Sequence, residues 1–246
     1  LCFAAGAFFS GILKRKKRQI KKELEEMKDD NADRKKLVAL QSVVEFAAEA
    51  KGTIGALVRH RVLKDLARYN HDKGVVDKDL SDLLRDVEAV ENMEDNDQKL
   101  IDRKGFGMDL RNAKEALDYF LNDKDPNLSD EKKLNLTDKQ KEEYKSAMES
   151  PAKFLKLMDD EKFREIADEL SEGMFGHLDQ GKVNALFSNV INASTDEELK
   201  DKLKRWGWDG LKKGGKWGGI LALILAAIPI VAGGATISAV KAASGR

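Results

Sequence analysis

Trp217 to Val240 reads WGGILALILAAIPIVAGGATISAV and carries no ionisable side chain, although 36% of the chain is charged. A run of about 18 or more apolar residues is long enough to cross the hydrocarbon core of a bilayer as a helix. A helix also satisfies every backbone N–H and C=O group inside the lipid. The stretch therefore predicts a C-terminal transmembrane segment. Its predicted membrane-spanning residues are Ile220, Leu221, Leu223, Ile224, Leu225, Ile228, Pro229, Ile230 and Val231.

The residues on the N-terminal side of this segment are typical of a membrane interface. Indole rings favour the headgroup layer, and lysine ammonium groups are attracted to anionic headgroups. All three tryptophans of the chain lie here, beside three lysines. The predicted interface residues are Trp206, Trp208, Lys212, Lys213, Lys216 and Trp217.

Pro229 leaves other geometries open for the same segment. It removes a backbone donor near the middle of the run and can kink a helix. One alternative is a hydrophobic hairpin that re-enters the bilayer and turns near Pro229. Another is a buried helix in a soluble bundle, which an apolar run also fits.

The N-terminal segment is the second apolar stretch. Residues 1–13, LCFAAGAFFSGIL, are apolar or small, and a basic cluster follows at once. If residues precede Leu1, the stretch is the inner end of a transmembrane helix and the cluster is its stop-transfer signal. Otherwise it is an interfacial anchor, or an apolar end packed in the protein's own core. The cluster, also predicted to lie at the interface, is Lys14, Arg15, Lys16, Lys17 and Arg18.

Composition limits the classes of function. The 44 basic and 44 acidic residues give zero net charge, which argues against nucleic acid as the main partner. Both ends are basic and the middle is acidic. The single cysteine, Cys2, permits no internal disulfide and no cysteine-based metal site. We expect no metal and no cofactor.

Between the two ends the sequence predicts helices throughout. A charged stalk follows the basic cluster, and the amphipathic stretch Asp33–Tyr69 breaks near Gly52 and Gly55, where glycine costs about 1 kcal/mol in a helix. A loop, GFGMDL, precedes a helix over Asp109–Leu121. Short capped helices occupy the second half. The predicted units are 1–30 (anchor and stalk), 31–122 (first helical subdomain), 123–136 (polar linker), 137–205 (second helical subdomain) and 206–246 (membrane segment).

No motif with catalytic chemistry is complete. His177 and Asp179 are neighbours, but no recognisable nucleophile accompanies them. The glycines and lysine of GLKKGGK (210–216) match a phosphate-binding loop, but Trp217 stands where that loop needs Ser or Thr. We therefore expect that the protein is not an enzyme, with an acidic cleft in the region 77–130 as the remaining enzymatic hypothesis.

The predicted fold class is all-α: a multi-helix body of short helices with a C-terminal transmembrane or hairpin segment and an apolar N-terminal segment. The leading functional hypothesis is a membrane-anchored scaffold or adaptor that contacts lipid and a protein partner or a second copy of itself. The alternative is a membrane-active protein that inserts from a soluble or packaged form, as pore-forming or virion-injected proteins do. The positive-inside rule predicts a membrane location with the body on the cytoplasmic face. We expect no nucleic-acid partner and identify no small-molecule substrate.

Overall fold

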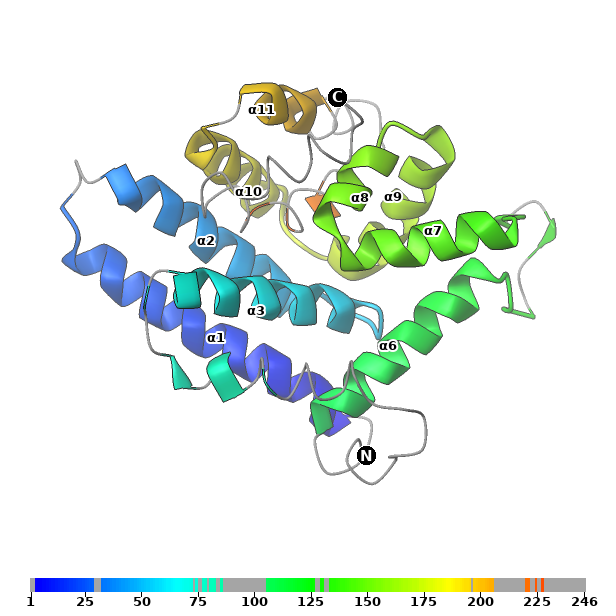
Figure 1. Ribbon diagram of the computed structural model, residues 1–246, viewed down its shortest axis with the longest axis horizontal. Coiled ribbons are helices and arrows are strands. Elements are labelled where there is room, and N and C mark those ends of the chain that lie inside the picture. Colours follow the sequence, from blue (N-terminus) through cyan, green and yellow to red (C-terminus); the bar gives the residue numbers. More distant parts are fainter. Residues whose placement is uncertain are drawn as a thin grey trace.

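The computed structural model describes residues 3–28, 32–72, 74, 77–78, 80–82, 85, 105–126, 129–130, 133–195, 197–205, 220, 221, 224 and 227. Within these ranges the chain forms helices and no strand, which confirms the all-α prediction. The helices are α1 (Phe3–Glu26), α2 (Ala32–Glu49), α3 (Gly55–Asp72), α6 (Gly105–Leu121), α7 (Asp138–Glu149), α8 (Pro151–Leu157), α9 (Glu161–Phe175), α10 (Gln180–Ala193) and α11 (Glu197–Lys204) (Figure 1).

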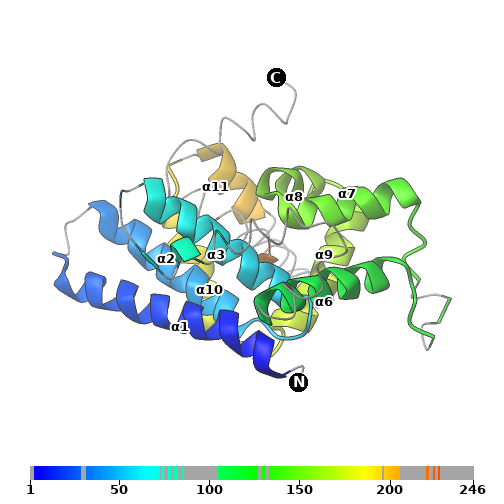
Figure 2. The ribbon, with the colours of Figure 1, turned by 60° about the horizontal axis from the view of Figure 1, so that its bottom comes forward.

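The first three helices lie side by side, and short connections make them antiparallel (Figures 1 and 2). The predicted break between α2 and α3 is confirmed. Gly52 lies in this connection with φ +74°, a left-handed conformation that glycine adopts without a steric penalty. The end of α1 is held by α2, because Arg34 Nη1 donates to the carbonyl of Leu24 at 2.6 Å. A cation at this position satisfies a helix C-terminus.

The charged stretch that follows the basic cluster is part of α1 and is not a solvated stalk. Ile20 and Leu24 are 6% and 8% exposed and belong to the core. The prediction of a solvated stalk is therefore wrong for the side of the helix that carries Ile20 and Leu24. It relied on the ion pairs between Lys21 and Glu25 and between Lys22 and Glu26, which do form on the exposed side at 3.8 and 3.9 Å.

α6 begins at Gly105, so the predicted loop GFGMDL is wrong. Two glycines disfavour a helix by about 1 kcal/mol each. α6 packs against α1 and α3 at one end and against α7 at the other (Figure 1). We attribute the longer helix to this packing, which sequence propensity does not register.

The end of the polar linker 123–136 is hydrogen-bonded to its first residue, Asp123. The carboxylate of Asp123 accepts hydrogen bonds from the backbone N–H groups of Leu134, at 2.7 Å, and Asn135, at 3.0 Å. Both Asp123 and Asn135 have positive φ, 52° and 49°. Across the linker, Lys114 on α6 pairs with Glu149 on α7 at 2.9 Å. The linker therefore closes a hairpin between α6 and α7.

The sequence predicts caps at Thr137, at Asp159 or Asp160, at Asp179 and at Ser194 or Thr195, with Pro151 opening a helix. The structure confirms Thr137, in a capping box with Gln140, Asp160 before α9, Asp179 before α10, and Pro151 as the first residue of α8. The side chain of Ser150 caps α8 by accepting the backbone N–H of Lys153. The cap before α11 stays a prediction.

One continuous core joins both halves of the chain. It contains buried side chains from α1, α2, α3 and α6 through α10, together with Leu80 and residues of the C-terminal segment. Phe46 on α2 and Phe175 on α9 bring the two halves together, with ring centroids 6.1 Å apart. The boundary between a first and a second subdomain stays a prediction.

We expect Asp123→Ala to lower the free energy of unfolding by about 1–3 kcal/mol, because two backbone N–H groups lose their acceptor. Urea unfolding followed by circular dichroism measures the change. Glu169→Ala, at an exposed position on α9, is the control and should change stability by less than about 0.5 kcal/mol. Equal effects of the two substitutions would contradict the role given to Asp123.

Candidate functional site

The basic cluster predicted at the membrane interface lies in the middle of α1, where it divides between two faces of the helix. Lys14, Arg15 and Arg18 are exposed, Lys17 is half-buried and Lys16 is only 4% exposed. Just before the cluster, Ile12 and Leu13 are in the core. Their burial favours an N-terminal segment packed in the protein's own core. The side chains of residues 1–9 lie outside the described part of the chain.

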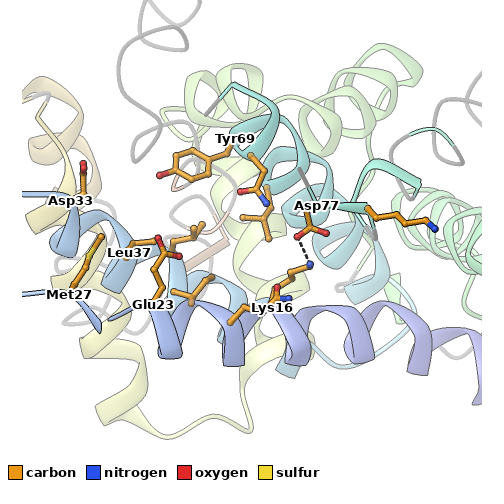
Figure 3. A pocket seen from close by; sticks show the side chains of 13 residues that line it. Lys16, Glu23, Met27, Asp33, Leu37, Tyr69 and Asp77 are labelled. Atoms are coloured by element: carbon orange, nitrogen blue, oxygen red, sulfur yellow. Dashed lines mark hydrogen bonds and ion pairs between the residues drawn. The ribbon is translucent and has the colours of Figure 1, made fainter. Parts of the chain in front are cut away.

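Lys16 is buried because an aspartate lies beside it. Its ammonium group forms an ion pair with the carboxylate of Asp77, and the two side chains are 5% and 16% exposed (Figure 3). The other oxygen of Asp77 accepts the backbone N–H of Leu80 at 3.2 Å. Asp77 therefore caps a helical turn, for which the sequence predicts either Asp77 or Ser81 as the cap, and it neutralises a cation of α1.

Lys17 joins a second, larger set of ion pairs. It contacts Glu45 on α2 at 2.8 Å, and Glu45 also lies 3.7 Å from Lys182 on α10. Lys182 in turn contacts Glu49 at 3.0 Å. The hydrogen bond to Glu49 and its negative charge raise the pKa of Lys182. These contacts link α1, α2 and α10.

A cavity of about 740 Å³ opens beside the Lys16–Asp77 pair, between α1, α2 and α3 (Figure 3). Tyr69, Glu23 and Asp33 lie at the end away from that pair (Figure 3). Burial raises the pKa of Tyr69, and the nearby charges of Asp33 and Glu23 raise it further. The remaining lining is mainly apolar and comprises Ile20, Met27, Leu37, Leu40 and Leu66, with Gln19, Asn70 and Lys78.

The cavity offers both charged and apolar contacts. Among the described residues that line it, none is a serine, threonine, cysteine or histidine. Among the described residues, no group of three or more His, Cys, Asp or Glu is placed to hold a metal ion. In the described part of the acidic region, Asp77 is paired with Lys16. The hypothesis of an enzyme with an acidic cleft stays untested.

His177 and Asp179 do not act as a pair in this structure. The Asp179 carboxylate accepts the backbone N–H groups of Gly181 and Lys182 at the start of α10. His177 is exposed, and desolvation together with the charge of Lys51 lowers its pKa.

The C-terminal segment contributes one helical face to the core. Ile220, Leu221, Ile224 and Ala227 are helical and at most 1% exposed. Their spacing of one, three and three residues places them on one side of a helix. Three of the predicted membrane-spanning residues are therefore buried inside the body.

The other residues predicted to contact the membrane at this end lie outside the described part of the chain. They are Trp206, Trp208, Lys212, Lys213, Lys216, Trp217, Leu223, Leu225, Ile228, Pro229, Ile230 and Val231. Among the helices that the structure does describe, none combines the length and the apolar character needed to cross a bilayer. The transmembrane segment and the cytoplasmic placement of the body stay predictions.

Sequence reasoning found the basic cluster and missed the carboxylates that divide it. Glu45 and Glu49 carry a usable signal, because they lie one helical turn apart in the otherwise uncharged and mostly apolar run LVALQSVVEFAAEA (37–50). Two carboxylates in such a run indicate a partner on a neighbouring helix. Asp77 was recognised as a cap, but nothing near it in the sequence points to Lys16.

Comparison of the chain with known protein families, curated proteins and solved structures finds no significant match.

We expect Asp77→Asn to lower the free energy of unfolding by about 3 kcal/mol, because the Lys16 ammonium stays buried without its counter-charge while the cap is kept. In Lys16→Met/Asp77→Asn no buried cation remains, so the double variant should lose less than the sum of the two single variants by about 1–3 kcal/mol. Urea unfolding of the four proteins measures this coupling. Strictly additive losses would show that the pair does not interact.

Proposed function

We propose that this is a membrane-active helical protein whose C-terminal apolar segment is sheltered in the body and enters a bilayer when it is released. The burial of Ile220, Leu221 and Ile224 in the common core carries the proposal. A segment that is long enough to span and is packed inside the body has to leave the body before it can contact lipid.

The length and composition of the segment support this reading over a permanent core helix. A helix at the centre of a soluble bundle needs only a run of ordinary helix length, whereas Trp217 to Val240 has no charge over a length that suits a bilayer. Its N-terminal flank carries every tryptophan of the chain and a group of lysines. These residue types stabilise a helix at the headgroup layer.

The energetics of release also support the proposal. The free energy of apolar side chains is lower in an apolar environment than in water. Lipid tails provide such an environment, because they are as apolar as a core of leucines. A segment that moves from the body into the bilayer therefore keeps its apolar side chains out of water. What this move requires is the separation of packed helices.

A membrane-anchored scaffold or adaptor is the second candidate. It is favoured by Tyr119, which is 46% exposed on α6 and lies beside a shallow groove of about 440 Å³ with Lys114, Glu115 and Lys124. Tyrosine is enriched in protein interfaces relative to the rest of the surface. An adaptor of this kind binds vesicles without permeabilising them.

Vesicle experiments on the whole chain test the proposal. We expect the protein to float with liposomes, to release an entrapped dye, and to lose tryptophan fluorescence when the acyl chains are brominated. The fluorescence reports on this region because all three tryptophans lie at 206–217. Ile228→Asp should reduce dye release at least tenfold, since an ionised carboxylate at the bilayer centre costs about 3 kcal/mol.

Ile228→Val is the matched control and should release dye like the parent chain. Circular dichroism shows whether both variants keep their helices in solution. If the parent chain neither floats nor loses fluorescence, the segment is a permanent core helix and the proposal is wrong. If it floats without dye release, the adaptor is the better account.

A further inference from the structure

The solvent-facing side of α1 carries a row of positively charged side chains. Lys14, Arg18 and Lys22 are exposed and follow one another at four-residue intervals, so they form one stripe of the helix. We call these three residues the cationic face. Lys22 is 3.9 Å from Glu26, and both side chains are more than two-thirds exposed. A pair so exposed leaves most of the charge available to a partner.

The orientation of this face is fixed by the opposite side of the helix. Lys16 is held by Asp77, Lys17 is held by Glu45, and Leu13 is fully buried in the core. Turning α1 about its axis would break both ion pairs and expose Leu13. The basic cluster is thus separated into cations neutralised inside the protein and cations held toward solvent.

We propose that the cationic face of α1 is the surface with which the protein first docks on an anionic lipid bilayer. This inference rests on the proposed function, because it names the membrane surface that the membrane-active protein recognises. Anionic headgroups attract a row of lysine and arginine side chains, and the attraction extends over about a Debye length.

The surroundings of the face favour a membrane over a nucleic acid. α1 continues without a break from the cationic face to Phe3, and its sequence there, FAAGAFFSGIL (3–13), carries no charge. The basic stripe therefore ends at an uncharged stretch of the same helix. At the other end the helix becomes acidic at Glu25 and Glu26, so the stripe is short. A chain of zero net charge lacks the excess of basic residues typical of nucleic-acid binders.

Neighbouring residues of the cluster provide a matched test. Arg18→Gln and Lys17→Gln each remove one positive charge from the same helix, but only Arg18 belongs to the cationic face. We expect Arg18→Gln to weaken binding to vesicles of phosphatidylcholine with about 30% phosphatidylserine by about fivefold. Lys17→Gln should leave the binding constant unchanged within twofold.

The triple variant Lys14→Gln/Arg18→Gln/Lys22→Gln should weaken the same binding on the order of 100-fold. Its control, Lys139→Gln/Lys153→Gln/Arg164→Gln, removes three exposed charges from α7, α8 and α9, on the far side of the molecule from α1 (Figure 1). Binding of the parent chain should fall between about 0.1 M and 0.5 M salt, because salt screens exposed charges. It should also be weak on pure phosphatidylcholine.

The outcomes separate this inference from the proposed function. Equal binding by the Arg18 and Lys17 variants, or equal binding to neutral and anionic vesicles, overturns the docking face even if dye release persists. Loss of binding in the triple variant without any dye release from the parent chain supports the face and sinks the proposed function. Tighter binding of the parent chain to a short DNA duplex than to anionic vesicles at the same salt, lost in the triple variant, would show a nucleic-acid surface instead and overturn the inference.

Discussion

The rotation of α1 about its own axis is the constraint on which the rest of the structure depends. A lysine is tolerated in the interior only beside an opposite charge, and Asp77 supplies that charge to Lys16. With this pair and the contact of Lys17 to Glu45 in place, Leu13 and Ile20 necessarily face the core. The same rotation decides which cations remain in solvent. Core packing and surface charge are therefore set together by two ion pairs.

Features that depend on residues within one helical turn could be predicted from the sequence. The break at Gly52 and the caps at Thr137, Asp160 and Asp179 are of this kind, because each is a backbone conformation or a hydrogen bond between near neighbours. The prediction of a loop at GFGMDL was wrong because the structure of this stretch depends on residues that are distant in the sequence. Its helical state depends on packing against α1 and α3, which lie far away in the sequence.

The candidate site shows the same division between local and distant information. The basic cluster is visible in the sequence, but Lys16 and Asp77 are separated by 61 residues, and Lys182 and Glu49 by 133. No local pattern pairs residues over such distances. The apolar C-terminal run could be recognised as a helix that avoids water. Whether protein or lipid surrounds it is a property of the whole fold, and the burial of Ile224 is visible only in three dimensions.

The side-chain caps of the second half have a consequence for how the body opens. Because α7, α9 and α10 each begin at their own capping residue, the hydrogen bonds that start these helices do not depend on neighbouring helices. Opening can then proceed by loss of side-chain interdigitation at nearly constant helix content, as in a molten globule. In such a state the far-ultraviolet circular dichroism stays close to native while the near-ultraviolet signal of the aromatic rings around Phe163 collapses. The architecture thus separates the stability of the helices from the stability of their arrangement.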